Sequence, residues 1–184
     1  AFAIMLVLFE GKMRALFTML FGASLILFME RAEAADRDGT AMQLRRLGWL
    51  ALFGYLHYAL FWWGDILFLY AAIGVIALSL RQMPDRLAVA AALTLFAVWH
   101  MSGAAGSIDT VIAEERVRIG TASVAQSREN AEAQAAFASY TSSNLAGLHD
   151  GFVAQVRHRL IDEPGWPISM TFGTLGGTLP LMLI

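Results

Sequence analysis

The chain has 184 residues, a formal net charge of −2, a mean hydropathy of +0.58 and only 15% charged residues. An average soluble domain carries about 25% charged residues, so the composition argues against a water-soluble globular protein. The near-neutral charge offers no basic face for nucleic acid. The absence of cysteine excludes a disulfide framework, a thiolate nucleophile and a cysteine-based metal site.

Long segments without Asp, Glu, Lys or Arg predict an all-α, polytopic bundle of about five transmembrane helices. The charge-free segments are 15–29, 47–64, 66–80, 87–107 and 164–184. Two of them reach the roughly twenty residues that cross a hydrocarbon core of about 30 Å. The others are shorter, but each adjoins an arginine, tryptophan or aspartate that can lie in the membrane interface and lengthen the helix.

The first charges of the chain follow a short apolar segment, residues 1–9, and they are Glu10, Lys12 and Arg14. Three charges within five residues are costly at the bilayer centre, so we expect 1–9 to end a preceding helix or to lie at the interface. The first membrane helix is predicted over 14–29. Because both ends of the chain are apolar, we expect it to be an internal part of a longer membrane protein, whose remaining helices are its partners together with membrane lipids.

Three further membrane helices are predicted within residues 1–106. They cover 43–63, 65–80 and 87–106. The turn Trp62–Asp65 joins the first two of them, because tryptophan favours the headgroup level and aspartate is a good helix N-cap. The loops 30–46 and 81–86 carry arginines, which favours the cytoplasmic side. The Trp62–Asp65 turn is therefore predicted to be extracytoplasmic.

Residues 107–163 are polar and are predicted to form an extracytoplasmic helical segment. Its apolar residues at spacings of three and four are Leu145, Leu148, Phe152, Val156 and Leu160. This spacing is typical of one apolar helix face, and it suits a small helical cap on the membrane or a substrate lid. The breaker Pro164–Pro167 ends the segment, and 164–184 is predicted to begin a further transmembrane helix.

Two histidines lie inside predicted membrane helices and are candidate functional residues. Counting back from Trp62 at 1.5 Å per residue places His57 roughly 8 Å below the outer interface, and His100 falls at a similar depth. Asp65 and the three charges that precede the first helix are predicted to lie in the same outer layer. Ionisable groups inside membranes usually face the bundle interior or a wet cavity, and histidine can accept a proton from a substrate near neutral pH.

Each candidate also has a purely structural interpretation. A neutral His57 or His100 can hydrogen-bond a neighbouring helix, and Asp65 can act only as a helix cap. Lys12 and Arg14 can meet lipid phosphates.

Other motifs in the sequence point to no reaction. His149 and His158 are nine residues apart and do not share a helical turn, so no metal site is predicted. The spacing Gly173-x-x-x-Gly177 is typical of close helix packing in membranes. Phosphate-binding loops, dinucleotide fingerprints and zinc-helix motifs are absent from the sequence.

Two blocks of the sequence resemble the YeiB-like family of bacterial inner-membrane proteins, whose defining region is domain of unknown function 418. The run Glu10–Phe17 followed by Leu20–Leu25 resembles the family block EGKFRxLFxxLFGAgL. The run Arg45–Gly74 resembles the block RRLxxLxxxGxxHxxLxWxGDILxxYAxxG. Order, spacing and charge placement agree over 10–80, whereas 81–163 agree only in layout.

The resemblance implies a multi-pass protein of the bacterial inner membrane. The family is similar in pattern to membrane acyltransferases, which move acyl groups to sugars at the outer face of a membrane with an intramembrane histidine. Carried over, the resemblance implies that His57 is the base and that Asp65, Lys12 and Arg14 orient substrate. Met13 departs from the family pattern, which usually has an aromatic residue there.

Three functions are therefore left open. The first is acyl transfer to a glycan or lipid acceptor at the outer face, with an acyl-coenzyme A as the expected donor. In that case His57 and Asp65 are the catalytic candidates, and the substrate-binding candidates are Glu10, Lys12, Arg14 and His100. The second is transport of a small solute or of protons along the same polar groups. The third is a non-catalytic envelope scaffold.

Overall fold

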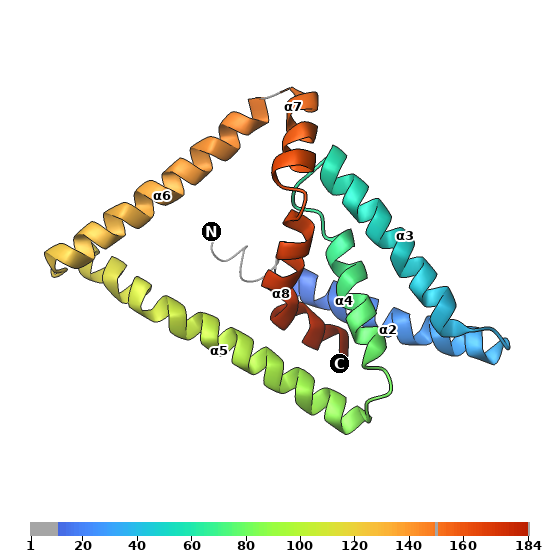
Figure 1. Ribbon diagram of the computed structural model, residues 1–184. Coiled ribbons are helices and arrows are strands. Elements are labelled where there is room, and N and C mark those ends of the chain that lie inside the picture. Colours follow the sequence, from blue (N-terminus) through green and yellow to red (C-terminus); the bar gives the residue numbers. More distant parts are fainter. Residues whose placement is uncertain (1–10, 150, 184) are drawn as a thin grey trace. The chain divides into compact units, whose positions relative to one another are not determined.

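The computed structural model describes residues 11–149 and 151–183 (Figure 1). These residues form helices and no strand, which confirms the predicted all-α class. Glu10 and the apolar segment 1–9 lie outside the described residues, so the prediction that 1–9 ends a preceding helix is untested.

The helices begin and end close to the predicted limits in the first half of the chain. They are α2 (Gly11–Ala34), α3 (Gly39–Leu60), α4 (Leu67–Ser79), α5 (Asp85–Arg118), α6 (Val124–His149), α7 (Phe152–Arg157), the π-helix η2 (His158–Asp162) and α8 (Trp166–Leu183). The main difference is α5, which continues past the predicted end at 106. Residues 107–118 contain no proline or glycine, and the helix ends only before Gly120, whose positive φ of 75° suits a glycine that follows a helix.

The predicted apolar face over 145–160 does not belong to one helix. The chain leaves helical geometry at Gly151, which has the extended backbone angles φ −62° and ψ 154° and precedes α7. Phe152 and Leu160 are largely exposed. The spacing was therefore misleading, because a break in the backbone resets the direction in which the following side chains point.

The described residues divide into two compact units. The first comprises the described residues up to Ala97 and those from Arg159 onward, and the second is Val98–His158. The second unit contains the end of α5, α6 and α7. The first unit contains α2, α3, α4, the start of α5 and α8.

Within the described residues, two helices are long and apolar enough to cross a membrane, rather than the expected five. They are Met13–Ala34 in α2 and Asp85–Arg118 in α5. The apolar helix α4 has only 13 residues. In α3 the pair Arg45 and Arg46 lowers the hydropathy, and α8 is rich in glycine, threonine and proline.

The core of the first unit forms where α2, α3, α4 and α8 pack together, with α4 between α3 and α8 (Figure 1). Its buried side chains are Leu25, Leu47, Leu69, Tyr70, Ile73, Ala77, Leu179 and Met182. Close approach depends on Gly22, because a Cβ atom there would collide with the backbone carbonyl of Met182. The predicted glycine pair in α8 behaves differently: Gly177 is buried, but open space surrounds Gly173.

Candidate functional site

His57 and Asp65 form a hydrogen-bonded pair where α3 ends and α4 is about to begin. The distance between His57 Nδ1 and Asp65 Oδ1 is 3.0 Å. The Asp65 side chain is 3% exposed, whereas the His57 side chain is 42% exposed. A carboxylate oxygen can only accept, so Nδ1 carries the hydrogen of this bond. The pair therefore combines a buried, orienting carboxylate with a ring that another molecule can reach.

The second carboxylate oxygen of Asp65 fixes the start of α4. Oδ2 accepts the backbone N–H of Phe68 at 3.0 Å, in the first turn of that helix. The N-cap position itself is taken by Ile66, which provides no side-chain cap. Asp65 thus satisfies an N–H that the helix leaves unpaired, and its charge lies near the positive end of the helix. The structural interpretation of Asp65 as a group that stabilises the start of α4 is thus confirmed through Oδ2, while Oδ1 holds His57 and its functional role stays a prediction.

Gly54 allows α3 to approach α4 closely enough for this pairing. A Cβ atom at Gly54 would collide with the backbone nitrogen of Phe68 and would lie 2.9 Å from Asp65 Oδ2. The ring of Phe61 stacks on the imidazole of His57, with 5.7 Å between the ring centroids and an interplanar angle of 26°. The His57 ring is therefore held on one face by Phe61 and at one nitrogen by Asp65.

The end of α3 beside His57 is also attached to the π-helix η2. The hydroxyl of Tyr58 donates to the carbonyl oxygen of Glu163, with the carbonyl oxygen of Arg159 3.4 Å away. In return, Arg159 Nη1 donates to the carbonyl oxygens of Tyr58 and Ala59 at 3.4 and 3.2 Å. Tyr58 and Arg159 are both buried. A cation is favourable at the C-terminal end of a helix, and π-helices frequently lie at functional sites. We call these contacts the Tyr58–Arg159 clamp.

Arg14 lies on the exposed surface of α2, at the same end of the first unit as Asp65. One turn after Arg14, the hydroxyl of Thr18 is 2.7 Å from the hydroxyl of Tyr70, in the first turns of α4. This buried contact aligns the beginnings of α2 and α4. Lys12 is part of α2, but its side chain, like Glu10, lies outside the described residues.

His100 does not belong to the unit that contains His57. It is exposed on α5, within the unit Val98–His158, so its predicted grouping with His57 stays a prediction. Among the described residues, no cluster of three or more His, Asp or Glu side chains could hold a metal ion.

Tryptophans gather near the His57–Asp65 pair. Trp166 Nε1 donates to the carbonyl oxygen of Trp63 at 3.2 Å, and the two rings meet edge to face at 6.1 Å. Trp62 and Trp63 are about half exposed. Tryptophan is enriched at the headgroup level of membranes, so this end of the first unit has the composition of a membrane–water boundary.

Comparisons with known proteins give relatives but no activity. No family model and no solved structure matches the chain. YxaH, an uncharacterized protein of Bacillus subtilis (strain 168), is 33% identical over 112 residues, which are 61% of this chain and 28% of YxaH. An uncharacterized 39.9 kDa protein in the amylase 3′ region of Bacillus acidopullulyticus is 36% identical over 74 residues, 40% of this chain and 21% of that protein. The matched part of the chain thus spans less than a third of the length of either relative.

Proposed function

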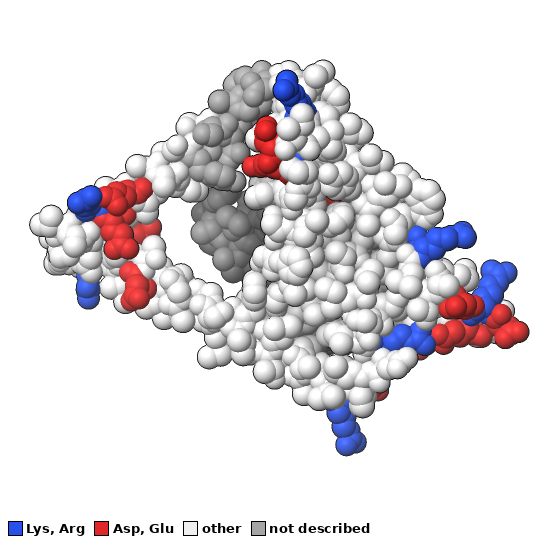
Figure 2. Space-filling view, in the orientation of Figure 1, with Lys and Arg blue, Asp and Glu red and all other residues white. Residues whose placement is uncertain are grey.

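We propose that this chain is part of a multi-pass protein of the bacterial inner membrane, in which α3, α4 and α8 span the membrane beside α2 and α5. Figure 2 shows that most of the face over α3, α4 and α8 carries no charge, while charged side chains gather near helix ends. Large apolar side chains that stay exposed on α3 are Trp49, Leu52, Phe53 and Leu56. Lipid tails or the remaining helices of the full-length protein would cover them.

The YeiB-like resemblance supports the same assignment. Its second block contributes Gly54, His57 and Asp65, and these residues meet in space although eleven positions separate the first from the last. Residues of one sequence block that come together around one polar pair have the arrangement expected of a functional motif. We therefore propose that the chain is a YeiB-like protein and that the His57–Asp65 pair is its functional site.

We further propose that His57 acts as a general base in acyl transfer to an acceptor at the extracytoplasmic surface. Asp65 accepts the hydrogen on Nδ1, which leaves the Nε2 lone pair to accept a proton. When an acceptor hydroxyl or amine attacks an acyl carbonyl, its proton passes to Nε2, and Asp65 stabilises the imidazolium. The proton then returns to the leaving group of the acyl donor. The observation that carries the proposal is the 3.0 Å bond from Nδ1 to a buried carboxylate.

The substrates follow from the position of the pair. The acceptor would be a glycan or lipid at the outer face, and the donor an acyl-coenzyme A or another activated acyl group. Arg14, at the same end of the unit, is available to a phosphate or a developing oxyanion, and Glu10, Lys12 and His100 remain candidates for binding substrate.

Proton-coupled or small-solute transport is the second candidate. A half-exposed histidine held by a buried carboxylate can take up and release a proton without any acyl chemistry. Transport would need the same His57 ring but no acyl donor, so a product measurement separates the two functions.

The deciding experiment is lipid and glycan mass spectrometry of cells with the full-length gene, without it, and with His57→Ala or Asp65→Asn. Acyl transfer predicts a product heavier by one acyl group that disappears without the gene and in His57→Ala. Asp65→Asn should lower the product by roughly 10²-fold or more, because the ring loses its orienting carboxylate. Tyr55→Phe is the matched control for a nearby aromatic change.

Other outcomes point to the other functions. Proton- or solute-dependent flux in sealed vesicles that is lost in His57→Ala, with no acyl product, would replace the enzyme by a transporter. A phenotype that survives His57→Ala but fails with Phe152→Asp would favour a scaffold. Either result would refute acyl transfer.

A further inference from the structure

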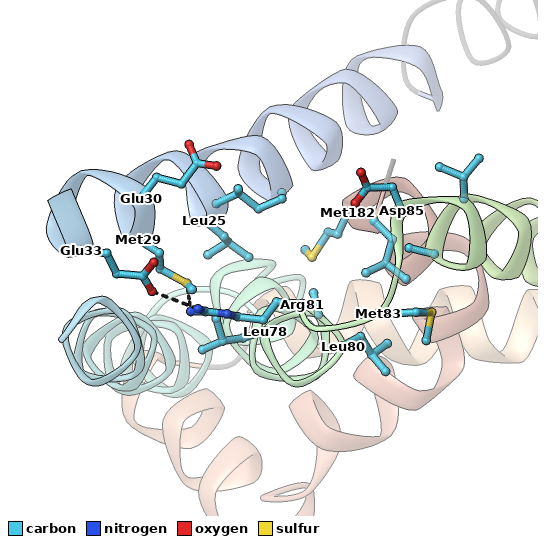
Figure 3. Close-up of a pocket in the computed structure, with 16 residues that line it drawn as sticks. Leu25, Met29, Glu30, Glu33, Leu78, Leu80, Arg81, Met83, Asp85 and Met182 are labelled. Atoms are coloured by element: carbon cyan, nitrogen blue, oxygen red, sulfur yellow. Dashed lines mark hydrogen bonds and ion pairs between the residues drawn. The ribbon is translucent and has the colours of Figure 1, made fainter.

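A second site of different chemistry lies in the first unit, at the opposite end of α4 from Asp65. It is a cavity of about 460 Å³ bounded by α2, the end of α4, the first turns of α5 and the C-terminal turn of α8 (Figure 3). The 13 residues of α4 separate it from Asp65, a rise of about 20 Å. Ligand pockets range over about 300–1,000 Å³, so this cavity is large enough for a small molecule or a lipid chain.

The walls of the cavity are apolar and adaptable. Leu25 and Met29 of α2, Leu78 of α4, Met83 and Met182 line it (Figure 3). Methionine is unbranched and polarizable and fits irregular apolar partners. The walls therefore suit a flexible hydrocarbon chain better than a rigid polar ligand.

The rim of the cavity carries an excess of negative charge. Glu30, Glu33, Asp85 and Arg81 line it (Figure 3). Arg81 Nη2 is 2.9 Å from Glu33 Oε1, and Arg81 Nη1 donates to the hydroxyl of Thr40 at 3.0 Å. The one cation among these lining residues is therefore already paired.

Two further carboxylates on the rim, Glu30 and Asp85, are exposed to solvent. Within the described part of the chain, Glu30 and Asp85 make no ion pair. Their neighbours in sequence, Arg31 and Arg86, are not among the residues that line the cavity. A phosphate, sulfate or coenzyme A head would meet like charge here, whereas a protonated amine would meet complementary charge.

We propose that this cavity binds an amphiphile with a hydrocarbon chain and a protonated amine head. The chain lies against the methionine and leucine walls, and the ammonium group lies at the acidic rim to which Glu30 and Asp85 belong. This site is independent of the acyl-transfer proposal, because it shares no residue with the His57–Asp65 pair.

The test uses the full-length protein in phosphatidylcholine nanodiscs and a dodecylamine probe with a diazirine at the end of its chain. After irradiation, mass spectrometry should find the label on peptides containing Met29, Leu78 or Met182. Unlabelled dodecylamine should compete, while dodecanol and dodecyl sulfate at the same concentration should compete about two- to fivefold less well, the factor expected for one partly screened ion pair.

Variants separate binding in the cavity from general partition into lipid. Val89→Trp places a large ring at the cavity wall and should abolish the labelling of these peptides. The double change Glu30→Gln with Asp85→Asn should lower amine labelling about two- to fivefold. It should not make dodecyl sulfate a better competitor than dodecylamine. Glu129→Gln, an exposed carboxylate outside the cavity, is the control and should change nothing.

The proposal fails under any of four results. Equal competition by the three amphiphiles, or labelling that persists in Val89→Trp, would show lipid partition only. No labelling of the lining peptides would show that another helix of the full-length protein fills the cavity. Loss of labelling in His57→Ala would contradict the independence of the two sites, whereas loss of acyl product alone leaves this inference intact.

Discussion

At the scale of single residues, close contacts between backbones make the site possible. Gly54 and Gly48 lie in the same helix but in opposite environments. Gly54 faces the backbone of α4, whereas a Cβ placed at Gly48 has no atom of another described element within 4 Å. This pair of glycines allows the contribution of close approach to be separated from the intrinsic effect of glycine on a helix.

We expect Gly54→Ala to lower the free energy of unfolding by about 1–3 kcal/mol, because the new methyl group must displace Phe68 or Asp65. Gly48→Ala should leave stability unchanged or raise it by up to about 1 kcal/mol. Titration of the purified protein with a denaturing detergent measures both. Equal behaviour of the two variants would mean that α3 and α4 do not approach as closely as the structure shows.

Gln43 provides a second prediction for a single side chain. It is 0% exposed in α3, and neither its Nε2 nor its Oε1 has a hydrogen-bond partner among the described residues. An unsatisfied buried polar group costs about 1–3 kcal/mol. Gln43→Met should therefore stabilise the protein by up to that amount in the same titration, while Gln82→Met, at an exposed position, should not. A destabilised Gln43→Met would indicate that the amide has a partner in the full-length protein.

At the scale of secondary-structure elements, the Tyr58–Arg159 clamp joins the end of α3 to η2 although the two residues are 101 positions apart. It acts on the turn that precedes Asp65, so it holds the helix end that carries His57. The clamp is made of side chain to backbone bonds in both directions: Arg159 donates to carbonyl oxygens at the end of α3, and Tyr58 donates to the carbonyl oxygen of Glu163, directly after η2.

Tyr58→Phe should destabilise the protein by about 0.5–1.5 kcal/mol, because it removes the hydrogen bond to the carbonyl oxygen of Glu163, which still accepts the backbone N–H of Trp166. A double-mutant cycle with Arg159→Met should give a coupling energy of about 0.5–3 kcal/mol. Tyr55→Phe is the control, since it keeps the ring that packs against Tyr58 and Phe68. Additive effects of Tyr58→Phe and Arg159→Met would show that the two sets of bonds act separately.

At the scale of the whole molecule, the arginine-bearing loops and the tryptophan-rich turn predict opposite sides of a membrane. Arg81 pairs with Glu33 at one end of the first unit, and the His57–Asp65 pair lies at the other end of α4. The two proposed sites would therefore be accessible from different compartments.

Single-cysteine variants test this orientation, and the chain itself contains no cysteine. In intact cells, a membrane-impermeant maleimide should modify Trp62→Cys but not Arg37→Cys or Gln82→Cys. All three should react after the cells are opened, which controls for accessibility. Modification of Gln82→Cys in intact cells would reverse the topology and place the acid–base pair on the cytoplasmic side.

The amino-acid sequence by itself determined the all-α class and the approximate limits of α2, α3, α4 and α8. Charge-free runs and helix breakers are local features, and local features decide where a helix begins and ends. The proximity of His57 and Asp65 was also predictable, because only eight positions and one turn separate them. The count of charge-free runs overestimated the number of clear membrane spans among the described residues, because α4 has only 13 residues and because polar or small residues lower the hydropathy of α3 and α8.

Only the tertiary structure decided which distant groups meet. The Tyr58–Arg159 clamp, the collision that forbids a side chain at Gly54 and the acidic rim around an apolar cavity all depend on how helices pack. His100 illustrates the difference. Its position along its helix could be counted from the sequence, but the structure places it in the unit Val98–His158, and His57 belongs to the first unit. Hydropathy is a property that adds up along the chain, whereas packing depends on the shape and charge of side chains that the chain brings together from far apart.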